Sequence, residues 1–229
     1  MSISMTNKAK KVLVLRWLLA ISFLCLTTTS YASGESPKMS KVNVFIIHGF
    51  MATPQDHWFQ WLKNELEAHG MVVKVLSLPD SSSPNPTNWH NAMSENIDKL
   101  NGNTFIVTHS LGTVSLLTYL EDRMSDNSMI GGLAIVSGFV SPLPELPQLN
   151  SFVSNQINFK KIIHMVPKRV VFGSPQDPIV PYALTKQLAK ELESEIYPIE
   201  NAGHFLASDG FETFPKLLKV LLSMIGEND

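Results

Sequence analysis

A serine stands where an apolar stretch meets a stretch of helical character, in Phe105-Ile106-Val107-Thr108-His109-Ser110-Leu111-Gly112. A tight strand-to-helix turn would expose the Ser110 hydroxyl and would leave the backbone N–H of Leu111 at a helix N-terminus, where it can stabilise an oxyanion. The usual motif is Gly-x-Ser-x-Gly, and Thr108 replaces its first glycine. We therefore take Ser110 as a candidate nucleophile, and the alternative is a serine that only caps a helix.

A nucleophilic serine needs a base, and the base needs an acid that orients it. His204 follows the last strand-like segment and Asp177 follows the one before it. The chain order Ser, Asp, His is the order expected for an α/β-hydrolase. His48-Gly49-Phe50 ends the first apolar segment, so the backbone N–H of Phe50 is a candidate second oxyanion donor.

Other acids and histidines compete for these roles. Asp209 follows His204 and breaks the chain order, and the other carboxylates considered are Glu200, Asp80 and Glu145. We expect the rings of His48 and His109 to shape the turns through hydrogen bonds to backbone. The remaining histidines show no paired spacing such as His-Glu-x-x-His, so we expect neither a metal site nor a cofactor; they are His57, His69, His90 and His164.

Short β-rich segments alternate with amphipathic ones from Lys41 onward. Several of the strand candidates are continuous apolar runs, which indicates strands covered on both faces; they are Val42–His48, Val72–Leu78, Asn103–Thr108, Gly132–Ser137, Arg169–Gly173 and Glu195–Ile199. This alternation predicts a mainly parallel sheet of about six strands with helices on both sides. The carboxyl ends of parallel strands share one edge, where Phe50, Ser110, Asp177 and His204 would then meet.

The helical segments carry apolar stripes and are separated by two proline-rich stretches. The stripes predict helices at 58–66, 89–100, 184–192 and 214–225, with a further one around 158–165. Residues 79–86 and 141–147 should be loops, because proline blocks strand and helix interiors. We expect these two loops to line an open site. Residues 138–167 leave room for a small flap but not for a large cap domain.

The charge of the 229-residue chain is unevenly distributed. The net charge is -2, but residues 1–32 carry four of the 18 basic residues and none of the 20 acidic ones. A chain that is 44% hydrophobic without clustered Lys and Arg is neither a disordered protein nor a typical nucleic-acid binder.

The amino terminus has the pattern of an export signal. A basic stretch precedes the apolar run 17–26, and Ser30-Tyr31-Ala32 resembles a cleavage site. We expect cleavage after Ala32 and a periplasmic or secreted protein; an uncleaved anchor is the alternative, although the run is shorter than the roughly 20 residues that span a bilayer. Cys25 is the only cysteine, so a mature chain from Ser33 to Asp229 would have neither a disulfide nor a thiol nucleophile.

Several motifs together resemble the small serine hydrolases of the YdeN and retinoblastoma-binding protein 9 type. The resemblance covers about Val42 to the C-terminus; its motifs are 48–50, His57-Trp58-Phe59-Gln60-Trp61-Leu62, 109–112, Val136-Ser137-Gly138-Phe139, Asp177-Pro178-Ile179-Val180-Pro181 and Gly203-His204-Phe205. It implies a three-layer α/β-hydrolase fold without a large cap domain, with Ser110 as nucleophile, Asp177 as acid and His204 as base. An export signal is a departure from the intracellular members of this type.

These residues predict a serine hydrolase that acts on a small acyl substrate. The triad serves esterases, thioesterases and peptidases alike, and we take an esterase as the first expectation. No stable membrane insertion is expected after signal cleavage, and no oligomeric state is indicated. The alternative from another class is an exported binding protein on a hydrolase scaffold, since a fold does not determine a function.

Overall fold

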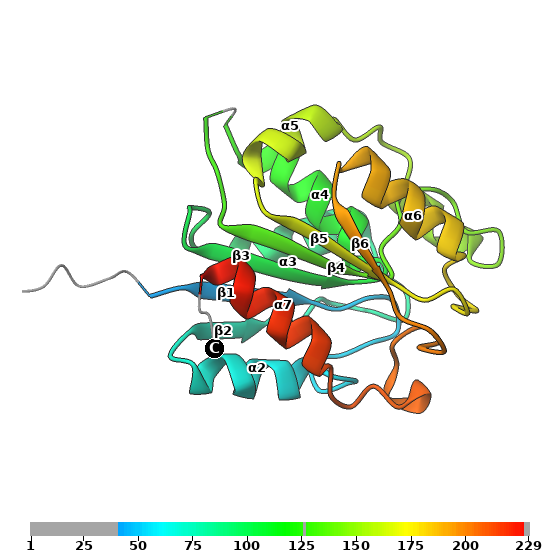
Figure 1. Ribbon diagram of the computed structural model, residues 1–229. Coiled ribbons are helices and arrows are strands. Elements are labelled where there is room, and N and C mark those ends of the chain that lie inside the picture. The colour runs from blue at the N-terminus through cyan, green and yellow to red at the C-terminus, as the bar shows by residue number, and fades with distance from the viewer. Residues whose placement is uncertain (1–40, 126, 227–229) are drawn as a thin grey trace, which may run out of the picture. The chain divides into compact units, whose positions relative to one another are not determined.

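Strands and helices alternate along the chain from β1 to α7 (Figure 1). The computed structural model describes residues 41–125 and 127–226, and the described elements belong to one compact unit. The expected export signal, residues 1–32, lies outside the described residues. Within the described ranges, no helix combines the length and the apolarity that a membrane span requires.

Six strands form one sheet in which every neighbouring pair is parallel. The strand order is β2-β1-β3-β4-β5-β6, and the bounds are β1 Asn43–Ile47, β2 Val72–Val75, β3 Thr104–His109, β4 Gly132–Val136, β5 Arg169–Gly173 and β6 Glu195–Pro198. The predicted mainly parallel sheet is therefore confirmed. The direction of chain progression reverses between β1 and β3, and open α/β sheets bind ligands beyond the carboxyl ends of the strands at such a switch point.

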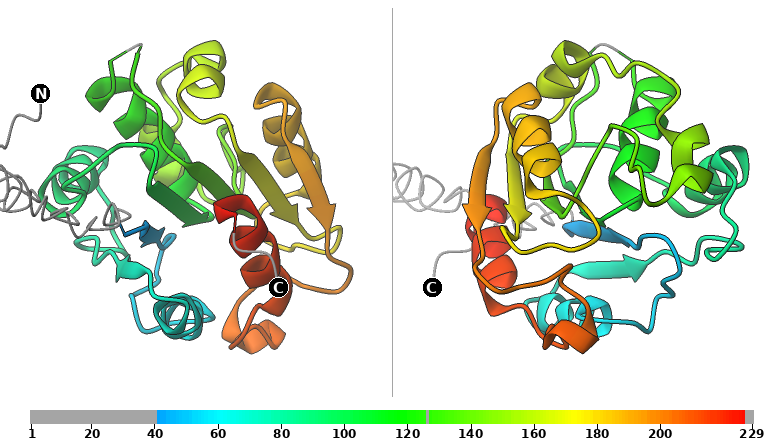
Figure 2. Two further views of the ribbon diagram at one scale, coloured as in Figure 1. Left: turned by 60° about the vertical axis from the view of Figure 1, so that its left-hand side comes forward. Right: turned by 90° about the vertical axis from the view of Figure 1, so that its right-hand side faces the viewer.

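Helices cover both faces of the sheet (Figures 1 and 2). They are α2 Phe59–Ala68, α3 Pro86–Asn96, α4 Gly112–Arg123, α5 Phe159–Met165, α6 Tyr182–Glu191 and α7 Pro215–Ile225. Successive side chains of a strand point to opposite faces. In β1, Val44 and Ile46 pack in the core beside α2 and α7, whereas Phe45 and Ile47 pack in the core beside α3, α4, α5 and α6. This burial on both faces explains the continuous apolar run of the strand.

Helix α3 is shorter than the sequence pattern predicted. It starts where Asn85 accepts hydrogen bonds from the N–H groups of Thr87 and Asn88, with Pro86 in its first turn. The expected continuation to Leu100 is wrong, because Ile97 has extended backbone angles (φ -100°, ψ 93°). Ile97 nevertheless stays buried. The apolar stripe in the sequence therefore continues to Ile97, although the helix ends at Asn96.

The connection from β4 to β5 holds only short elements above the sheet. It consists of loop, the 3-10 helix η1 (Pro147–Phe152) and α5. Leu149 and Phe152 anchor η1 because both are buried in the core that includes α3 and α4. No large cap domain is present in this described segment.

Candidate active site

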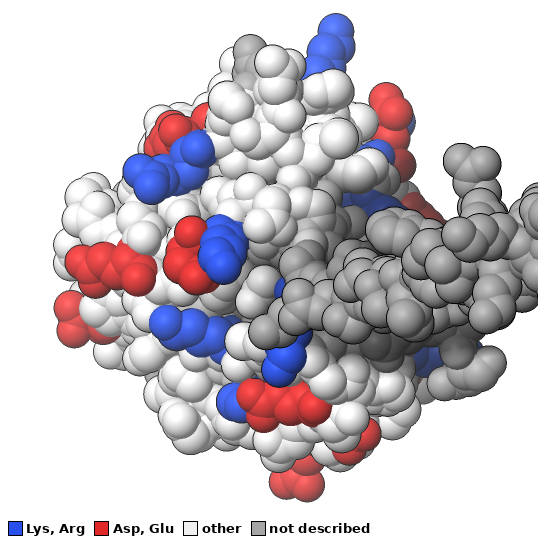
Figure 3. Space-filling model, turned by 90° about the vertical axis from the view of Figure 1, so that its left-hand side faces the viewer, with Lys and Arg blue, Asp and Glu red and all other residues white. Residues whose placement is uncertain are grey.

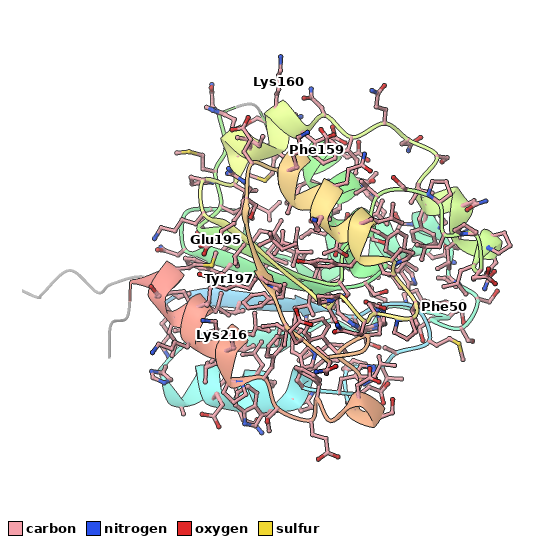
Figure 4. The ribbon with its side chains drawn as sticks, turned by 45° about the vertical axis from the view of Figure 1, so that its right-hand side comes forward. Phe50, Phe159, Lys160, Glu195, Tyr197 and Lys216 are labelled. Atoms are coloured by element: carbon pink, nitrogen blue, oxygen red, sulfur yellow. The ribbon has the colours of Figure 1, made fainter. Side chains whose placement is uncertain are left out.

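A cavity of about 370 Å³ opens beyond the carboxyl ends of the strands. Its lining includes Phe50 from the turn after β1, Ser110 from the turn after β3 and His204 from the loop after β6. The right-hand view of Figure 2 looks toward this edge, and Figure 4 marks Phe50 there. Phe50, Ser110 and His204, which the sequence singled out, therefore line one cavity, and Asp177 contacts His204.

Ser110 occupies a strained turn between β3 and α4. Its φ is +53°, a left-handed conformation that costs a non-glycine residue free energy. The Ser110 N–H donates to the Val136 carbonyl at 3.0 Å, and its own carbonyl accepts from the Thr113 N–H at 3.0 Å. These bonds hold the turn and place the side chain at the cavity wall with 6% of the residue exposed.

Two glycines allow the neighbouring backbone to approach this turn. A Cβ on Gly49 would lie 2.8 Å from Ser110 Cβ, and a Cβ on Gly112 would lie 2.6 Å from the His48 carbonyl oxygen. Real Cβ atoms do not approach this closely, so both positions require glycine. Because neither residue has a side chain, the turn after β1 can pack closely against the turn that holds Ser110.

Thr108 stands where the usual motif has its first glycine, and the structure accounts for it. Thr108 is fully buried, and its Oγ1 forms a 2.9 Å hydrogen bond with Thr113 Oγ1 on α4. A Cβ on Gly138 would lie 2.6 Å from Thr113 Oγ1. The threonine pair therefore fits because residue 138, at the end of the adjacent strand β4, has no side chain.

The two expected oxyanion donors have no competing acceptor. Within residues 41–125 and 127–226, no hydrogen-bond acceptor contacts the N–H of Phe50 or of Leu111. Leu111 is fully buried and precedes the first turn of α4. An unpaired buried N–H is costly unless a ligand or water uses it. The two groups can therefore donate to an oxygen bound beside Ser110.

His48 holds the turn that carries Phe50. Its Nδ1–H donates to the Gly49 carbonyl at 2.9 Å, while its Nε2 accepts from the Leu78 N–H at 3.2 Å. Burial lowers the pKa of His48, which agrees with a neutral ring that donates at one nitrogen and accepts at the other. In addition, the Met51 N–H donates to the Ser81 carbonyl at 2.8 Å.

His204 and Asp177 form a buried pair behind the cavity. His204 Nδ1 lies 2.8 Å from Asp177 Oδ2, and the two side chains are 5% and 1% exposed. The other carboxylate oxygen, Oδ1, accepts the N–H groups of Ile179 at 2.8 Å and Val180 at 2.9 Å. These bonds orient the carboxylate toward the imidazole, and the Nδ1 contact leaves Nε2 as the nitrogen that can act as a base.

Ser137 is a member of this cluster that the sequence did not identify as part of the site. It is fully buried at the end of β4 with a φ of +45°, and its Oγ donates to Asp177 Oδ2 at 2.7 Å. The motif Val136-Ser137-Gly138-Phe139 was used only for the family resemblance. Its signal was a small polar residue directly after a buried strand; Asp177 likewise follows a strand, four residues after the end of β5.

The competing carboxylates take other roles. Asp209 Oδ2 accepts from the N–H groups of His204 at 2.9 Å and Leu206 at 3.1 Å, so it holds the loop and does not contact the ring. Glu200 Oε2 accepts from the Gln176 side chain at 2.9 Å. Glu145 lines the cavity. Among the described carboxylates, only Asp177 forms an ion pair with the His204 ring.

Two further histidines adjoin His204. The His109 Nε2–H donates to the His204 carbonyl at 2.9 Å, and its Nδ1 has no partner among the described residues. His57 Nδ1 accepts from the Ala207 N–H at 3.1 Å. Burial lowers the pKa of both rings, that of His109 well below the ordinary value. The expected structural role of His109 is supported, whereas the place of His57 in the cavity wall was missed.

Ser110 and His204 line the same cavity, but no hydrogen bond joins their side chains in the described part of the chain. Hydrogen bonds of this kind are often long before substrate binds and tighten in the complex. The geometry therefore brings the expected nucleophile and base to one cavity and orients the base through Asp177.

The expectation that both proline-rich loops line the site is half wrong. The second loop contributes Glu145 and Leu146 to the cavity wall, whereas no residue of 79–86 does. The first loop instead supports the turn after β1, through the Ser81 carbonyl, and the Pro79 carbonyl accepts from the Trp89 indole at 2.8 Å. The first loop therefore contacts the turn after β1 and does not line the cavity.

Comparison with known proteins agrees with this architecture. Residues 44–223 match the serine hydrolase family. YdeN of Bacillus subtilis (strain 168) is 37% identical over 180 residues, which are 79% of this chain and 94% of that protein. The serine hydrolase RBBP9 of Rattus norvegicus is 25% identical over 170 residues, which are 73% of this chain and 86% of RBBP9.

A solved structure extends the likeness to the fold. The crystal structure of the ydeN gene product from B. subtilis superposes with a TM-score of 0.79 at 36% identity and covers 82% of this chain and all of that one. The sequence match spans nearly every described element, from β1 to α7. The chain is thus a member of the serine hydrolase family with the α/β-hydrolase fold.

Proposed function

We propose that this protein hydrolyses a small ester through a covalent acyl-enzyme formed on Ser110. The observation that carries the proposal is the 2.8 Å contact of His204 Nδ1 with the buried Asp177 carboxylate, at the cavity that Ser110 also lines. A histidine oriented in this way can present Nε2 to a serine hydroxyl. Thioesters and amides react by the same steps, so an ester is the first choice among three acyl substrates.

In the proposed reaction, His204 Nε2 removes the proton of the Ser110 hydroxyl as Oγ bonds to the substrate carbonyl carbon. The N–H groups of Leu111 and Phe50 donate to the oxyanion that develops. The intermediate collapses, the bond to the leaving group breaks, and His204 returns the proton to that group. Water, deprotonated by His204, then attacks the acyl carbon. The bond between this carbon and Ser110 Oγ breaks, His204 returns the proton to Oγ, and the acid leaves.

Labelling with a fluorophosphonate probe tests the nucleophile. We expect Ser110→Ala to lose labelling and to reduce kcat by about 10⁴- to 10⁶-fold, because the serine, base and acid act as one unit. Ser154→Ala is the matched control, since Ser154 is exposed and lies outside the cavity lining. Unchanged turnover of p-nitrophenyl butyrate by Ser110→Ala would exclude the proposal.

We also propose that the protein acts after export, because residues 1–32 have the composition of a cleaved signal. Amino-terminal sequencing of the protein recovered from the periplasm or medium of its own host tests this. The expected first residue is Ser33, and an intact Met1 on protein recovered from the cytoplasm would contradict the proposal.

A further inference from the structure

We infer that the cavity selects acyl substrates that are apolar and carry no negative charge, and that Glu145 is the residue that excludes anionic ones. This inference rests on the proposed hydrolase function and adds a substrate class to it. It comes from three features of the cavity, which are its apolar wall, its exposed apolar rim and its single acidic side chain.

The wall of the cavity is mainly apolar. Seven of its twelve lining residues have apolar side chains, and they are Phe50, Met51, Leu146, Leu149, Pro178, Ile179 and Leu206. Leu149 is 2% exposed because η1 packs into the core. A volume of about 370 Å³ lies at the lower end of the range of roughly 300–1,000 Å³ for small-molecule sites. A compact apolar group is therefore the complementary occupant.

Exposed apolar side chains extend this wall to the surface. Met51 is 69% exposed and Ile179 is 36% exposed, and they come from the loops after β1 and β5. Within the described residues, only two other large apolar side chains are as exposed, Val72 and Met129. Neither of those lines the cavity. Exposed apolar groups at the rim of a cavity are typical of a surface that a ligand covers.

Glu145 is the only acidic residue among the lining residues, and neither lysine nor arginine accompanies it there. The Glu145 side chain is exposed, and within the described ranges no cation pairs with it. The cavity also contains His57 and His109, whose pKa values are lowered by burial, which favours the neutral form of both rings. An anionic substrate would therefore meet a carboxylate and neither lysine nor arginine.

Basic side chains line a groove at the opposite end of the sheet. The groove lies between β6 and α7, and its charged lining residues are Lys168, Arg169, Lys216, Lys219 and Glu195. Lys168 directly precedes β5 and Glu195 begins β6, so the groove lies toward the amino ends of these strands. Lys216 Nζ lies 4.9 Å from the centre of the Tyr197 ring (Figure 4). Figure 3, seen from the side on which β1 begins, shows Lys and Arg interspersed with Asp and Glu.

Three p-nitrophenyl esters of similar size test the inference. They are the butyrate, the negatively charged hemisuccinate and the positively charged 4-aminobutyrate. For the wild-type protein we expect the hemisuccinate to have the lowest kcat/KM. Glu145→Gln should raise the ratio of kcat/KM for hemisuccinate to that for butyrate by about two- to fivefold, the size typical of an exposed charge interaction.

The control is Glu212→Gln, which makes the same change in net charge as Glu145→Gln. Glu212 is exposed and does not line the cavity. We expect this variant to keep the wild-type ratio. High salt should reduce the wild-type discrimination, because screening weakens interactions of exposed charges. Equal rates for hemisuccinate and butyrate, or the same ratio change in both variants, would overturn the inference. Fluorophosphonate labelling of Ser110 in the same samples reports separately on the proposed function.

Discussion

The Ser137 hydroxyl donates to the same oxygen of Asp177, Oδ2, that lies against His204 Nδ1. The two distances are 2.7 Å and 2.8 Å, so one carboxylate oxygen joins the end of β4 to the loop after β6. Ser137 makes this contact from a left-handed backbone conformation, φ +45°. Strain of this kind persists where the surrounding structure requires it, and it often occurs at functional sites.

Ser137→Ala should therefore weaken the orientation of the acid. A hydrogen bond to a charged group contributes about 1.5–3 kcal/mol, so we expect kcat/KM to fall by roughly tenfold or more, mostly through kcat.

Ser137→Gly is the matched variant, because glycine also lacks the hydroxyl but adopts a positive φ without strain. We expect the same loss of kcat/KM in both variants. Wild-type activity in Ser137→Gly would instead assign the effect of Ser137→Ala to the backbone, and the positioning role would be abandoned.

Asp177 and Asp209 should respond differently to the loss of charge. Asp177→Asn should reduce kcat by about 10⁴-fold, because an amide can hold His204 in the wrong tautomer. Asp209→Asn keeps an oxygen that can accept from the His204 and Leu206 N–H groups. We therefore expect it to retain most of the activity. Steady-state kinetics of both variants test which carboxylate orients His204. A larger loss of kcat in Asp209→Asn than in Asp177→Asn would assign that role to Asp209.

Substitution of the glycines around the turn that holds Ser110, even by alanine, should destabilise the protein. Gly112→Ala places a Cβ against the His48 carbonyl, and Gly138→Ala places one against Thr113. Each should lower the free energy of unfolding by about 1–3 kcal/mol, the usual cost of overpacking. Gly102→Ala is the control, since nothing lies within 4 Å of its Cβ position. Urea unfolding measures all three, and equal stability of the three variants would contradict the close approach.

Stability should fall with acid because of the buried histidines. Burial lowers the pKa of His48, His57 and His109, so the unfolded chain binds protons that the folded protein does not. The free energy of unfolding should be level above about pH 7 and should decrease below the ordinary pKa of about 6.5. Each histidine contributes at most about 1.4 kcal/mol per pH unit.

The variant His109→Gln isolates the strongest of these shifts, because glutamine does not titrate but can still donate to the His204 carbonyl. We expect a shallower decrease of the free energy of unfolding between pH 6.5 and the folded-state pKa of His109. Chemical denaturation at a series of pH values gives the slope, and equal slopes in variant and wild type would refute this origin.

The size of the cavity should limit the acyl chain. Across p-nitrophenyl esters from acetate to dodecanoate, we expect kcat/KM to be highest for short chains, because about 370 Å³ holds a compact group and no large cap adds a further apolar surface. Hydrolysis by Ser110→Ala provides the background rate. A maximum at dodecanoate would show that the open rim, not the cavity, binds the acyl chain.

Much of the fold was readable because parallel strands buried on both faces are continuous apolar runs. The run Val44-Phe45-Ile46-Ile47 became β1, and Ser110, Asp177 and His204 stood out as polar residues that follow predicted strands. Helix ends were not readable in the same way, as at Ile97, because a buried apolar residue outside a helix extends the same periodic stripe.

By itself, the sequence determined the strand and helix alternation, and therefore the edge at which the candidate nucleophile, base and acid meet. Only the tertiary structure decided which carboxylate contacts His204, why Thr108 fits, and that Ser137 and His57 adjoin the site. These depend on contacts between distant segments, such as Ser137 with Asp177, that local pattern does not encode. Strand periodicity is a local property, whereas a hydrogen bond between two loops exists only after the sheet has brought their strand ends together.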